Sequence, residues 1–205
     1  MKTCILIRHA ITPGNVLRRY TGRRSDEGII MPDPEEVSKI RDKTNEYISR
    51  HIKGEFSVVS GPQKRSRETA GLLFPKRDIA TVYELSEMDL GIFEGKTYEE
   101  LKDVPEYVSW LDSKGRMTIP GGEERDEFIR RSMEGFKKAV ALAGDDGLVI
   151  VCHGGNIMAI MSTLTDLDYY DCQVQNLEGY VLNIDADDER ITVDSYDRIA
   201  CGPYN

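Results

Sequence analysis

The chain has 205 residues, of which 40% are hydrophobic and 31% are charged, and its formal net charge is −9 at pH 7. This length and composition predict one soluble globular domain over residues 1–205. The acidic balance argues against a nucleic acid or an anionic membrane as the main partner, although an acidic surface still allows a basic pocket for a small anion.

The N-terminal stretch is a short apolar run, Cys4–Ile7, that leads directly into Arg8 and His9. The run predicts a buried strand over about residues 2–7. Because ligands in open α/β sheets lie just beyond the carboxyl ends of the strands, Arg8 and His9 stand where catalytic residues are usually found. The strand begins close to Met1, and the apolar runs are shorter than the roughly 18–20 residues of a membrane span. We therefore expect neither a signal peptide nor a membrane anchor, which favours a cytoplasmic protein.

A polar loop over residues 12–31 follows and carries four arginines within seven residues. Such a cluster is typical of an anion-facing loop, although Arg23 and Arg24 are better explained as solvated surface residues. The stretch from Asp33 to Glu36 (Asp-Pro-Glu-Glu) predicts a helix start. Aspartate caps a helix, proline suits its first turn, and acidic residues complement its dipole. This helix is expected to end near residues 53–54.

Residues 56–59 predict a second strand, and the turn after it opens into a helix that holds Arg65 in its first turns. A cation gains nothing from the dipole at that end of a helix, so its position there suggests a bound anion. Residues 79–83 predict a third short strand. The segment over residues 86–122 then shows helical patches without a strand pattern, and we expect it to cover the strand ends and the active site.

The covering segment is rich in aromatic residues. Tyr98 and Tyr107 either line the pocket or pack the segment, whereas packing is favoured for Trp110. A periodic apolar pattern over residues 123–143 predicts a long helix after the covering segment.

The fourth apolar run, residues 148–152, repeats the arrangement at His9, because it ends in His153 and two glycines before a helical pattern. A single histidine at a strand end is most often structural, but two histidines in matched settings indicate a shared role. The third histidine of the chain, His51, lies in a polar helical stretch and is predicted to be a surface residue.

Residues 179–184 and 190–193 predict a closing hairpin. Strands that alternate with helices predict an α/β fold, a three-layer α/β/α sandwich with a mostly parallel, mixed sheet. The four cysteines lack the spacing of a metal site or a redox motif. We interpret them as reduced thiols, which suits a cytoplasmic protein.

Five short motifs occur in order along the chain. They are Arg8-His9-Ala10-Ile11-Thr12 with Asn15, Arg19 and Gly22; Ser60-Gly61-Pro62 with Arg65 and Thr69-Ala70; Leu85, Glu87 and Gly91 with Phe93-Glu94-Gly95; Pro120-Gly121-Gly122-Glu123; and His153-Gly154-Gly155. Together they resemble the signatures of the histidine phosphatase superfamily, the phosphoglycerate mutase-like group. Ala10 and Glu124 stand where the family usually has glycine and serine, and the second change puts a substrate contact at that position in doubt.

The resemblance implies a metal-independent phosphoric monoester hydrolase in which His9 is the nucleophile and is transiently phosphorylated. Arg8, Arg65 and His153 are placed around the phosphate, since cationic donors suit its oxygens. The arginines also keep His9 unprotonated, as a nucleophile must be. Glu87 is the expected proton donor and later the base that activates water. The further substrate contacts that we expect are Asn15, Thr21, Gly22 and Gly154.

The expected substrate is a small phosphorylated metabolite, and the implied chemistry requires no metal and no other cofactor. The closest alternative is a cofactor-dependent phosphoglycerate mutase. The compact covering segment favours hydrolysis, because a smaller cover gives water better access. A catalytically silent binding module is disfavoured because all the catalytic residues are present, and a Rossmann domain because G-x-G-x-x-G and P-loop motifs are lacking. The sequence leaves open which phosphomonoester is bound, α-ribazole phosphate included, and whether the chain forms a homodimer.

Overall fold

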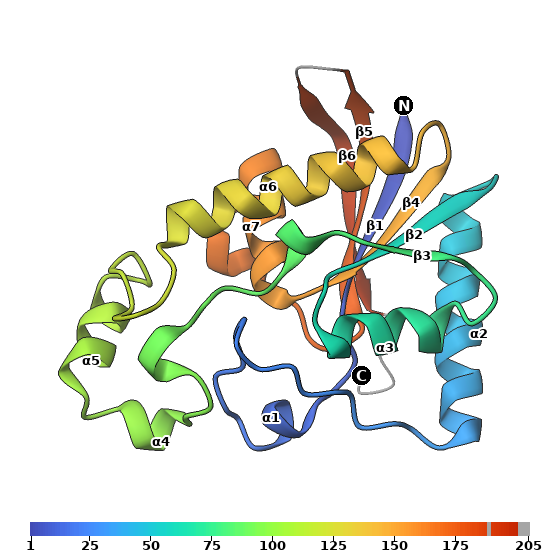
Figure 1. Ribbon diagram of the computed structural model, residues 1–205. Coiled ribbons are helices and arrows are strands. Elements are labelled where there is room, and N and C mark those ends of the chain that lie inside the picture. The colour runs from blue at the N-terminus through green and yellow to red at the C-terminus, as the bar shows by residue number, and fades with distance from the viewer. Residues whose placement is uncertain (188–189, 201–205) are drawn as a thin grey trace.

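The computed structural model describes residues 1–187 and 190–200, and its centre is a mixed six-stranded sheet (Figure 1). The strands are β1 (Lys2–Arg8), β2 (Phe56–Ser60), β3 (Ile79–Thr81), β4 (Gly147–Cys152), β5 (Glu178–Ala186) and β6 (Ile191–Ala200). Their order across the sheet is β3-β2-β4-β1-β5-β6. The first four are parallel, β5 runs antiparallel to β1, and β6 runs antiparallel to β5.

Helices join and cover these strands. They are α1 (Pro13–Val16), α2 (Pro34–His51), α3 (Lys64–Leu73), α4 (Tyr98–Leu101), α5 (Pro105–Asp112), α6 (Arg125–Leu142) and α7 (Gly154–Leu164), with the 3-10 helices η1 (Tyr83–Leu85), η2 (Gly91–Phe93) and η3 (Tyr169–Cys172). The start of α2 follows the prediction, because the side chain of Asp33 accepts a hydrogen bond from the backbone N–H of Glu36 at 2.9 Å.

The helices form layers on both faces of the sheet, α2 and α3 on one face and α6 and α7 on the other (Figure 1). Successive residues of β1 point to opposite layers. Cys4 and Leu6 pack in the core with α6 and α7, whereas Ile5 and Ile7 pack in the core with α2 and α3. This burial on both faces explains the unbroken apolar run. The predicted α/β/α sandwich with a mixed sheet is confirmed.

The bounds of β3 and β6 differ from the predicted ones for identifiable physical reasons. β3 ends at Thr81, two residues early, because Tyr83 already belongs to η1. β6 is ten residues long where residues 190–193 were predicted. It pairs with β5 along its length, and the exposed Asp194 and Asp197 give it the charged surface that edge strands commonly carry. Because of these charged residues, the sequence of β6 lacks the apolar pattern by which a strand is predicted.

The segment over residues 86–122 has a small core of its own. Its buried members are Phe93, Leu101, Tyr107 and Ile119. Trp110 stacks on Tyr107 with ring centroids 5.9 Å apart, so both residues pack the segment. Tyr98 is 53% exposed.

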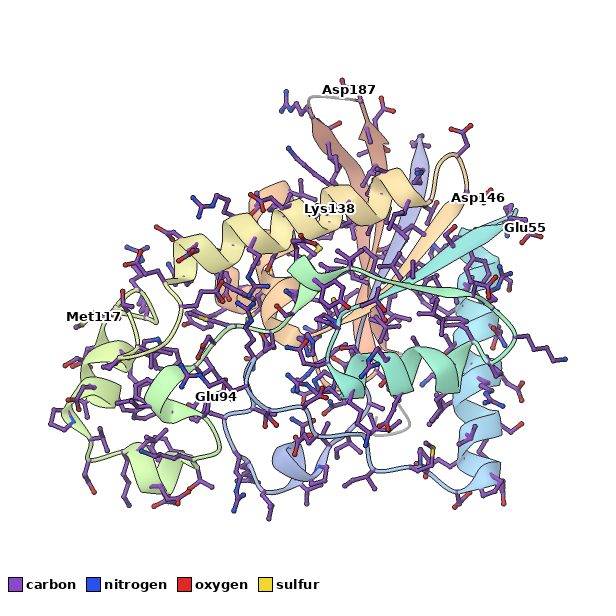
Figure 2. The ribbon with its side chains drawn as sticks, viewed as in Figure 1. Glu55, Glu94, Met117, Lys138, Asp146 and Asp187 are labelled. Carbon is purple, nitrogen blue, oxygen red and sulfur yellow. The ribbon has the colours of Figure 1, made fainter. Side chains whose placement is uncertain are left out.

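Glu94 connects this segment to the arginine-rich loop after α1 (Figure 2). Its carboxylate accepts hydrogen bonds from the backbone N–H groups of Gly22 at 3.0 Å and Arg24 at 3.1 Å. Two backbone donors on one carboxylate fix the loop against the covering segment.

No helix within residues 1–187 and 190–200 has the length and apolar composition needed to cross a membrane. Cys4, Cys152 and Cys172 are buried free thiols. Cys201 lies outside the described residues.

Candidate active site

Two histidines lie side by side at the carboxyl edge of the sheet because β1 and β4 are parallel neighbours. Arg8 is paired with Cys152 in the register of these strands, so His9 directly follows one strand and His153 directly follows the other. The backbone N–H of His9 donates to the carbonyl of Cys152 at 2.9 Å. The two imidazole rings meet edge to face, with their centroids 5.2 Å apart. The matched positions in the sequence therefore form one site.

The imidazole of His9 has one ring nitrogen committed to the backbone. Its Nδ1 lies 2.8 Å from the carbonyl oxygen of Ala10. A carbonyl oxygen can only accept, so Nδ1 carries the proton and Nε2 of the neutral ring keeps its lone pair. Burial, followed by the positive charges of Arg65 and Arg8, lowers the pKa of His9 well below its ordinary value. His9 is thus held in the form that a nucleophile needs.

Arg65 and His153 form a buried network beside His9. The Nε of Arg65 donates to Nδ1 of His153 at 3.2 Å. The proton of the neutral His153 ring therefore sits on Nε2, which lies 2.8 Å from Oε1 of Gln63. The other guanidinium nitrogens of Arg65 donate to two backbone carbonyls at 2.8 and 3.1 Å.

This network changes the position predicted for Arg65 and His153. Both side chains are 0% exposed, and neither lines the cavity that holds His9. The sequence placed them around the phosphate, but α3 begins at Lys64 and turns Arg65 into the core. The hydrogen-bond partners of its guanidinium are neutral groups, so its charge acts on His9, whose pKa it lowers. The structure supports an electrostatic role for Arg65, whose guanidinium His153 helps to hold in place.

Arg8 reaches the cavity from the end of β1. One of its terminal nitrogens donates to the carbonyl of Val174 at 2.7 Å. Its Nε is buried and has no hydrogen-bond partner within residues 1–187 and 190–200. Such a donor is costly when unpaired, and an anionic oxygen would satisfy it. A Cβ at Gly154 would contact this Nε at 3.6 Å, so glycine keeps that face of the guanidinium open.

Glu87 follows η1 and faces the same cavity. Its carboxylate accepts hydrogen bonds from the N–H groups of Met88 at 2.9 Å and Gly155 at 3.3 Å. Burial raises the pKa of Glu87 and outweighs the lowering effect of these bonds and of the nearby arginines. A raised pKa suits a carboxyl group that must hold a proton before donating it. A Cβ at Gly155 would lie 2.2 Å from this carboxylate, so the close approach requires glycine.

The cavity that His9, Arg8 and Glu87 share has a volume of about 450 Å³. Asn15, Thr21 and Gly154 line it, where the sequence placed them. Gly22 does not, because its N–H donates to Glu94 and its carbonyl accepts from Arg65. A Cβ at Gly22 would meet the Glu94 carboxylate at 2.4 Å, so this glycine serves packing.

Sequence reasoning missed Asn176, which lies in the loop before β5. Its side-chain amide donates to the carbonyl of His9 at 2.9 Å and to Oδ1 of Asn15 at 3.0 Å. It therefore ties the backbone of His9 to a residue of the cavity wall. An asparagine in a polar connection carries no signal that would have identified it.

Arg131 of α6 was also missed, and it holds the backbone around Glu87. Its guanidinium forms a bidentate pair with Glu123 at 2.9 and 2.8 Å. It also donates to the carbonyls of Ser86 at 2.9 Å and Glu87 at 3.3 Å. The pair is largely buried, with the side chains of Arg131 and Glu123 16% and 9% exposed. An arginine beside the apolar stripe of a helix usually indicates a surface position. The periodic pattern of α6 therefore gave no reason to single out Arg131.

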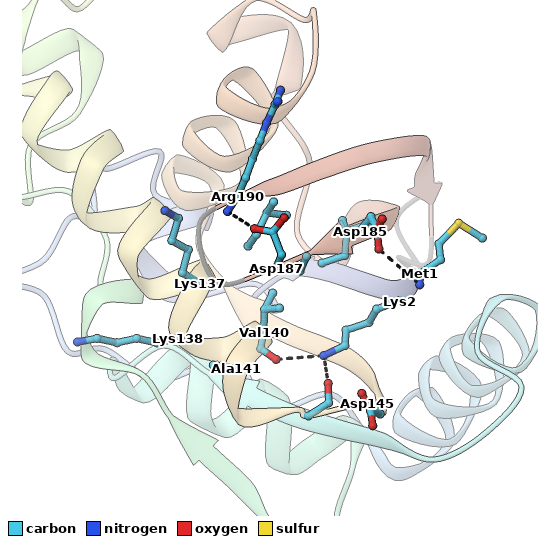
Figure 3. A pocket seen from close by; sticks show the side chains of 14 residues that line it. Met1, Lys2, Lys137, Lys138, Val140, Ala141, Asp145, Asp185, Asp187 and Arg190 are labelled. Carbon is cyan, nitrogen blue, oxygen red and sulfur yellow. Dashed lines mark hydrogen bonds and ion pairs between the residues drawn. The ribbon is translucent and has the colours of Figure 1, made fainter.

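A second hollow, of about 570 Å³, lies at the opposite end of β1, beside the β5–β6 hairpin (Figure 3). Two of its charged groups are engaged locally. Lys2 donates to the carbonyl of Val140 at 3.1 Å, and the N-terminal amine pairs with Asp185 at 3.7 Å. The histidine pair and Glu87 gather at the other end of the sheet, so we place the candidate active site there.

Comparison with known proteins agrees with this geometry. A model of the histidine phosphatase superfamily (branch 1) matches residues 4–196. The chain belongs to this superfamily. A crystal structure of phosphoserine phosphatase from Entamoeba histolytica, in complex with 3-phosphoglyceric acid, shares the fold. Its TM-score is 0.75 at 20% identity, with 98% of this chain and 99% of that chain covered.

Several relatives match most of the chain. A metal-independent phosphoserine phosphatase of Arabidopsis thaliana is 28% identical over 171 residues, which cover 78% of this chain and 68% of the relative. An adenosylcobalamin/alpha-ribazole phosphatase of Salmonella typhimurium is 27% identical over 164 residues, covering 78% and 77%. A Proteus mirabilis protein named as a phosphoglycerate mutase is 25% identical over 169 residues, covering 80% and 75%. The predictions of the family, of its fold and of a phosphoric monoester hydrolase are confirmed.

Proposed function

We propose that the cavity hydrolyses phosphomonoesters of small metabolites in two steps, through a phosphorylated His9. The observation that carries this proposal is the 2.8 Å hydrogen bond between His9 Nδ1 and the carbonyl of Ala10, because it leaves Nε2 as an unprotonated nucleophile. The cavity volume of about 450 Å³ suits a small molecule.

In the first step, Nε2 of His9 forms a bond to phosphorus while the ester P–O bond breaks. The unpartnered Nε of Arg8 binds a phosphoryl oxygen, and the buried charge of Arg65 stabilises the transition state. The departing oxygen takes the proton of Glu87. The products of this step are the free alcohol, an ionised Glu87 and a phosphorylated His9.

In the second step, water attacks the same phosphorus. Glu87 accepts a proton from that water as its oxygen bonds to phosphorus. The P–N bond breaks, and its electron pair returns to Nε2 of His9. Phosphate leaves, and Glu87 and His9 are restored to their starting protonation states.

A trapping experiment tests the nucleophile. The enzyme is mixed with an alkyl phosphate that carries a labelled phosphoryl group, and the reaction is quenched in alkali. Phosphohistidine is stable in alkali but is hydrolysed in acid. We expect alkali-stable label on the wild type and on the control His51→Ala. His9→Ala should carry no label and release no phosphate. Label on His9→Ala, or phosphate release by it at the wild-type rate, would overturn the proposal.

One incubation separates hydrolysis from the mutase alternative. With 3-phosphoglycerate and a bisphosphoglycerate primer, we expect free phosphate to accumulate. Isomerisation to 2-phosphoglycerate without free phosphate would instead identify a mutase.

We also propose a cytoplasmic location. Cys4, Cys152 and Cys172 are free thiols, and free thiols persist in a reducing compartment. Cell fractionation tests the proposal, and recovery of the chain in a secreted fraction would contradict it.

A further inference from the structure

The peptide unit before His9 is still held by the backbone of its neighbours. The carbonyl of Arg8 accepts a hydrogen bond from the N–H of Leu177, the residue before β5, at 3.0 Å. On the opposite side, the N–H of His9 donates to the carbonyl of Cys152, the last residue of β4, at 2.9 Å. The plane of this peptide unit is therefore fixed from both sides.

The next peptide unit, between His9 and Ala10, lies beyond the strand, and two side chains hold it. The amide of Asn176 donates to the His9 carbonyl at 2.9 Å. The hydroxyl of Thr69 accepts from the Ala10 N–H at 2.9 Å and donates to the carbonyl of Arg65 at 2.7 Å. Because the carbonyl and the N–H of one peptide unit point in opposite directions within one plane, these side chains hold that plane from both sides.

The two held planes determine the placement of the His9 ring. Together they set the φ and ψ angles of His9, and with them the direction in which its side chain leaves the backbone. The second plane also leads directly into the Ala10 carbonyl, which lies 2.8 Å from Nδ1 of His9. A rotation of that plane would move this carbonyl away from Nδ1 and release the proton that it keeps there.

The backbone at Leu177 shows that the position of the neighbouring Asn176 is maintained against strain. Leu177 has a φ of +62°, in the left-handed region that a leucine rarely adopts. Strained residues of this kind persist where the surrounding structure demands them, and they gather at functional sites. With this backbone, the N–H of Leu177 reaches Arg8 while the side chain of Asn176 reaches His9.

We propose that Thr69 and Asn176 are positioning residues for the nucleophile, because together they hold the peptide unit after His9 and so keep Nε2 directed at the cavity and free of a proton. Thr69 belongs to α3 and Asn176 to the loop before β5, so two separate elements meet on this peptide unit. Both act through His9 and touch no reacting atom. The inference rests on the proposed function, since it takes His9 to be the group that is phosphorylated.

Two substitutions at the fully buried Thr69 separate its hydroxyl from its packing. Thr69→Val keeps the shape and loses the hydroxyl, whereas Thr69→Ser keeps the hydroxyl and loses a methyl group. On an alkyl phosphate and on p-nitrophenyl phosphate alike, we expect kcat/KM to fall about tenfold or more in Thr69→Val and to stay within about threefold of wild type in Thr69→Ser. The reverse order would identify a packing role and overturn the proposal.

Thr44→Val is the matched control for this experiment. Thr44 is also a buried threonine of a helix, but it lies on α2 and is not among the residues that hold His9. It should keep the wild-type kcat/KM on both esters.

Asn176→Leu is the corresponding change on the other side of the peptide unit. Leucine keeps the branched shape and removes both N–H donors. We expect kcat/KM to fall about tenfold or more on both esters. Because Asn176 also donates to Oδ1 of Asn15 at 3.0 Å, the kinetic loss does not by itself identify His9 as the group affected.

Heteronuclear NMR of protein with isotope-labelled histidine makes that identification, because it reports which ring nitrogen carries the proton. The chain has three histidines, and the spectrum of His9→Gln identifies the signals of His9 by their loss. At neutral pH we expect a protonated Nδ1 and a bare Nε2 in the wild type and in Thr69→Ser. In Thr69→Val and Asn176→Leu the proton should be shared between the two nitrogens, since the Ala10 carbonyl no longer holds it on Nδ1.

The outcomes separate the inference from the proposed function. If the wild type releases phosphate from neither ester, the proposed function fails and the inference falls with it. If the wild type is active but Thr69→Val and Asn176→Leu keep its rate, or keep its His9 proton on Nδ1, the inference alone is overturned. If Thr69→Val does not fold, Asn176→Leu decides alone, because Asn176 is only half-buried.

Discussion

The two sides of the active site are built differently, one by the sheet and the other by a loop. The register of β1 and β4 fixes His9 and His153, and buried hydrogen bonds set the protonated nitrogen of each ring. Glu87 lies outside the strands. Its position depends on two backbone N–H groups and on Arg131, which binds its carbonyl.

This difference separates the consequences of substitution. In the proposed mechanism, a change at the sheet edge alters the nucleophile, which every substrate needs. A change at the loop alters proton donation, which only substrates with poor leaving groups need. The ratio of activity on an alkyl phosphate to activity on p-nitrophenyl phosphate therefore shows which side a substitution has damaged.

Among substitutions that leave His9 in place, the largest effect is expected at the loop side. Glu87→Gln should lower kcat/KM for an alkyl phosphate by about a thousandfold, because the amide cannot donate a proton to the alkoxide. The loss on p-nitrophenyl phosphate should be about tenfold or less, since that leaving group hardly needs a proton. Phosphate release from both esters measures the effect, and equal losses on the two would contradict the acid role.

The pH profile gives an independent test of Glu87. Burial raises its pKa, and the protonated form is the donor, so activity on alkyl phosphates should fall as pH rises through that raised pKa. In Glu87→Gln this alkaline limb should disappear from kcat/KM. An alkaline limb that persists unchanged would assign it to another group.

A smaller effect is expected at the sheet edge. Arg65→Gln should lower kcat/KM by about a hundredfold on both esters alike, because it removes buried positive charge from the transition state. It should also raise the pKa of His9, since the Arg65 charge now lowers it, and move the acid limb to higher pH. Arg65→Lys keeps the charge and should leave that limb nearer its original place.

Arg67→Gln is the matched control for this experiment, because Arg67 is exposed on the same helix, α3. It should match the wild type on both esters. If Arg65→Gln lowered kcat/KM for the alkyl ester alone, Arg65 would act on proton donation. The distinction between the sheet side and the loop side of the site would then be wrong.

A still smaller effect is expected for the residue that positions the loop. Arg131→Lys keeps the charge but cannot form the bidentate pair with Glu123 while also donating to the carbonyls of Ser86 and Glu87. We expect kcat/KM for the alkyl ester to fall about tenfold, and the value for p-nitrophenyl phosphate to change by about twofold or less. Arg130→Lys, at the exposed neighbouring position, should change neither.

The same contrast explains how much of the fold the sequence predicted. The strands β1 and β4 are buried on both faces, so each appears as an unbroken apolar run that ends where the sheet ends. The edge strand β6 has an exposed side, so its charged residues interrupt the pattern, and only three of its residues, 191–193, were expected. Strand prediction succeeded where burial alone decides the residue types.

Prediction of the site followed the same rule. His9 and His153 were found because the residue after a buried strand is set by local sequence. Arg131 was missed because its contact with the Glu87 carbonyl joins residues 44 positions apart, and a helical pattern contains no trace of that contact. Gly22 was assigned to substrate binding because the sequence does not show that the Glu94 carboxylate lies against it. Only the folded structure shows that this carboxylate leaves no room for a side chain at Gly22.

The smallest effect concerns stability and tests whether the sheet edge holds His9 neutral. Burial lowers the pKa of folded His9 well below 6.5, its ordinary value, whereas the unfolded chain keeps that ordinary value. Above pH 6.5 both states are neutral and His9 adds no pH dependence. Below it the unfolded state binds a proton that the folded state does not, so the free energy of unfolding falls with falling pH.

Denaturant unfolding of the wild type and of His9→Gln between pH 7 and pH 5 measures this contribution. The other titrating groups are common to both proteins, so the difference between the two curves isolates His9. Below pH 6.5, the wild type should lose up to about 1.4 kcal/mol per pH unit more than the variant. Parallel curves would mean that folded His9 is protonated as readily as the unfolded one. Its Nε2 would then lack the lone pair that attacks phosphorus at that pH.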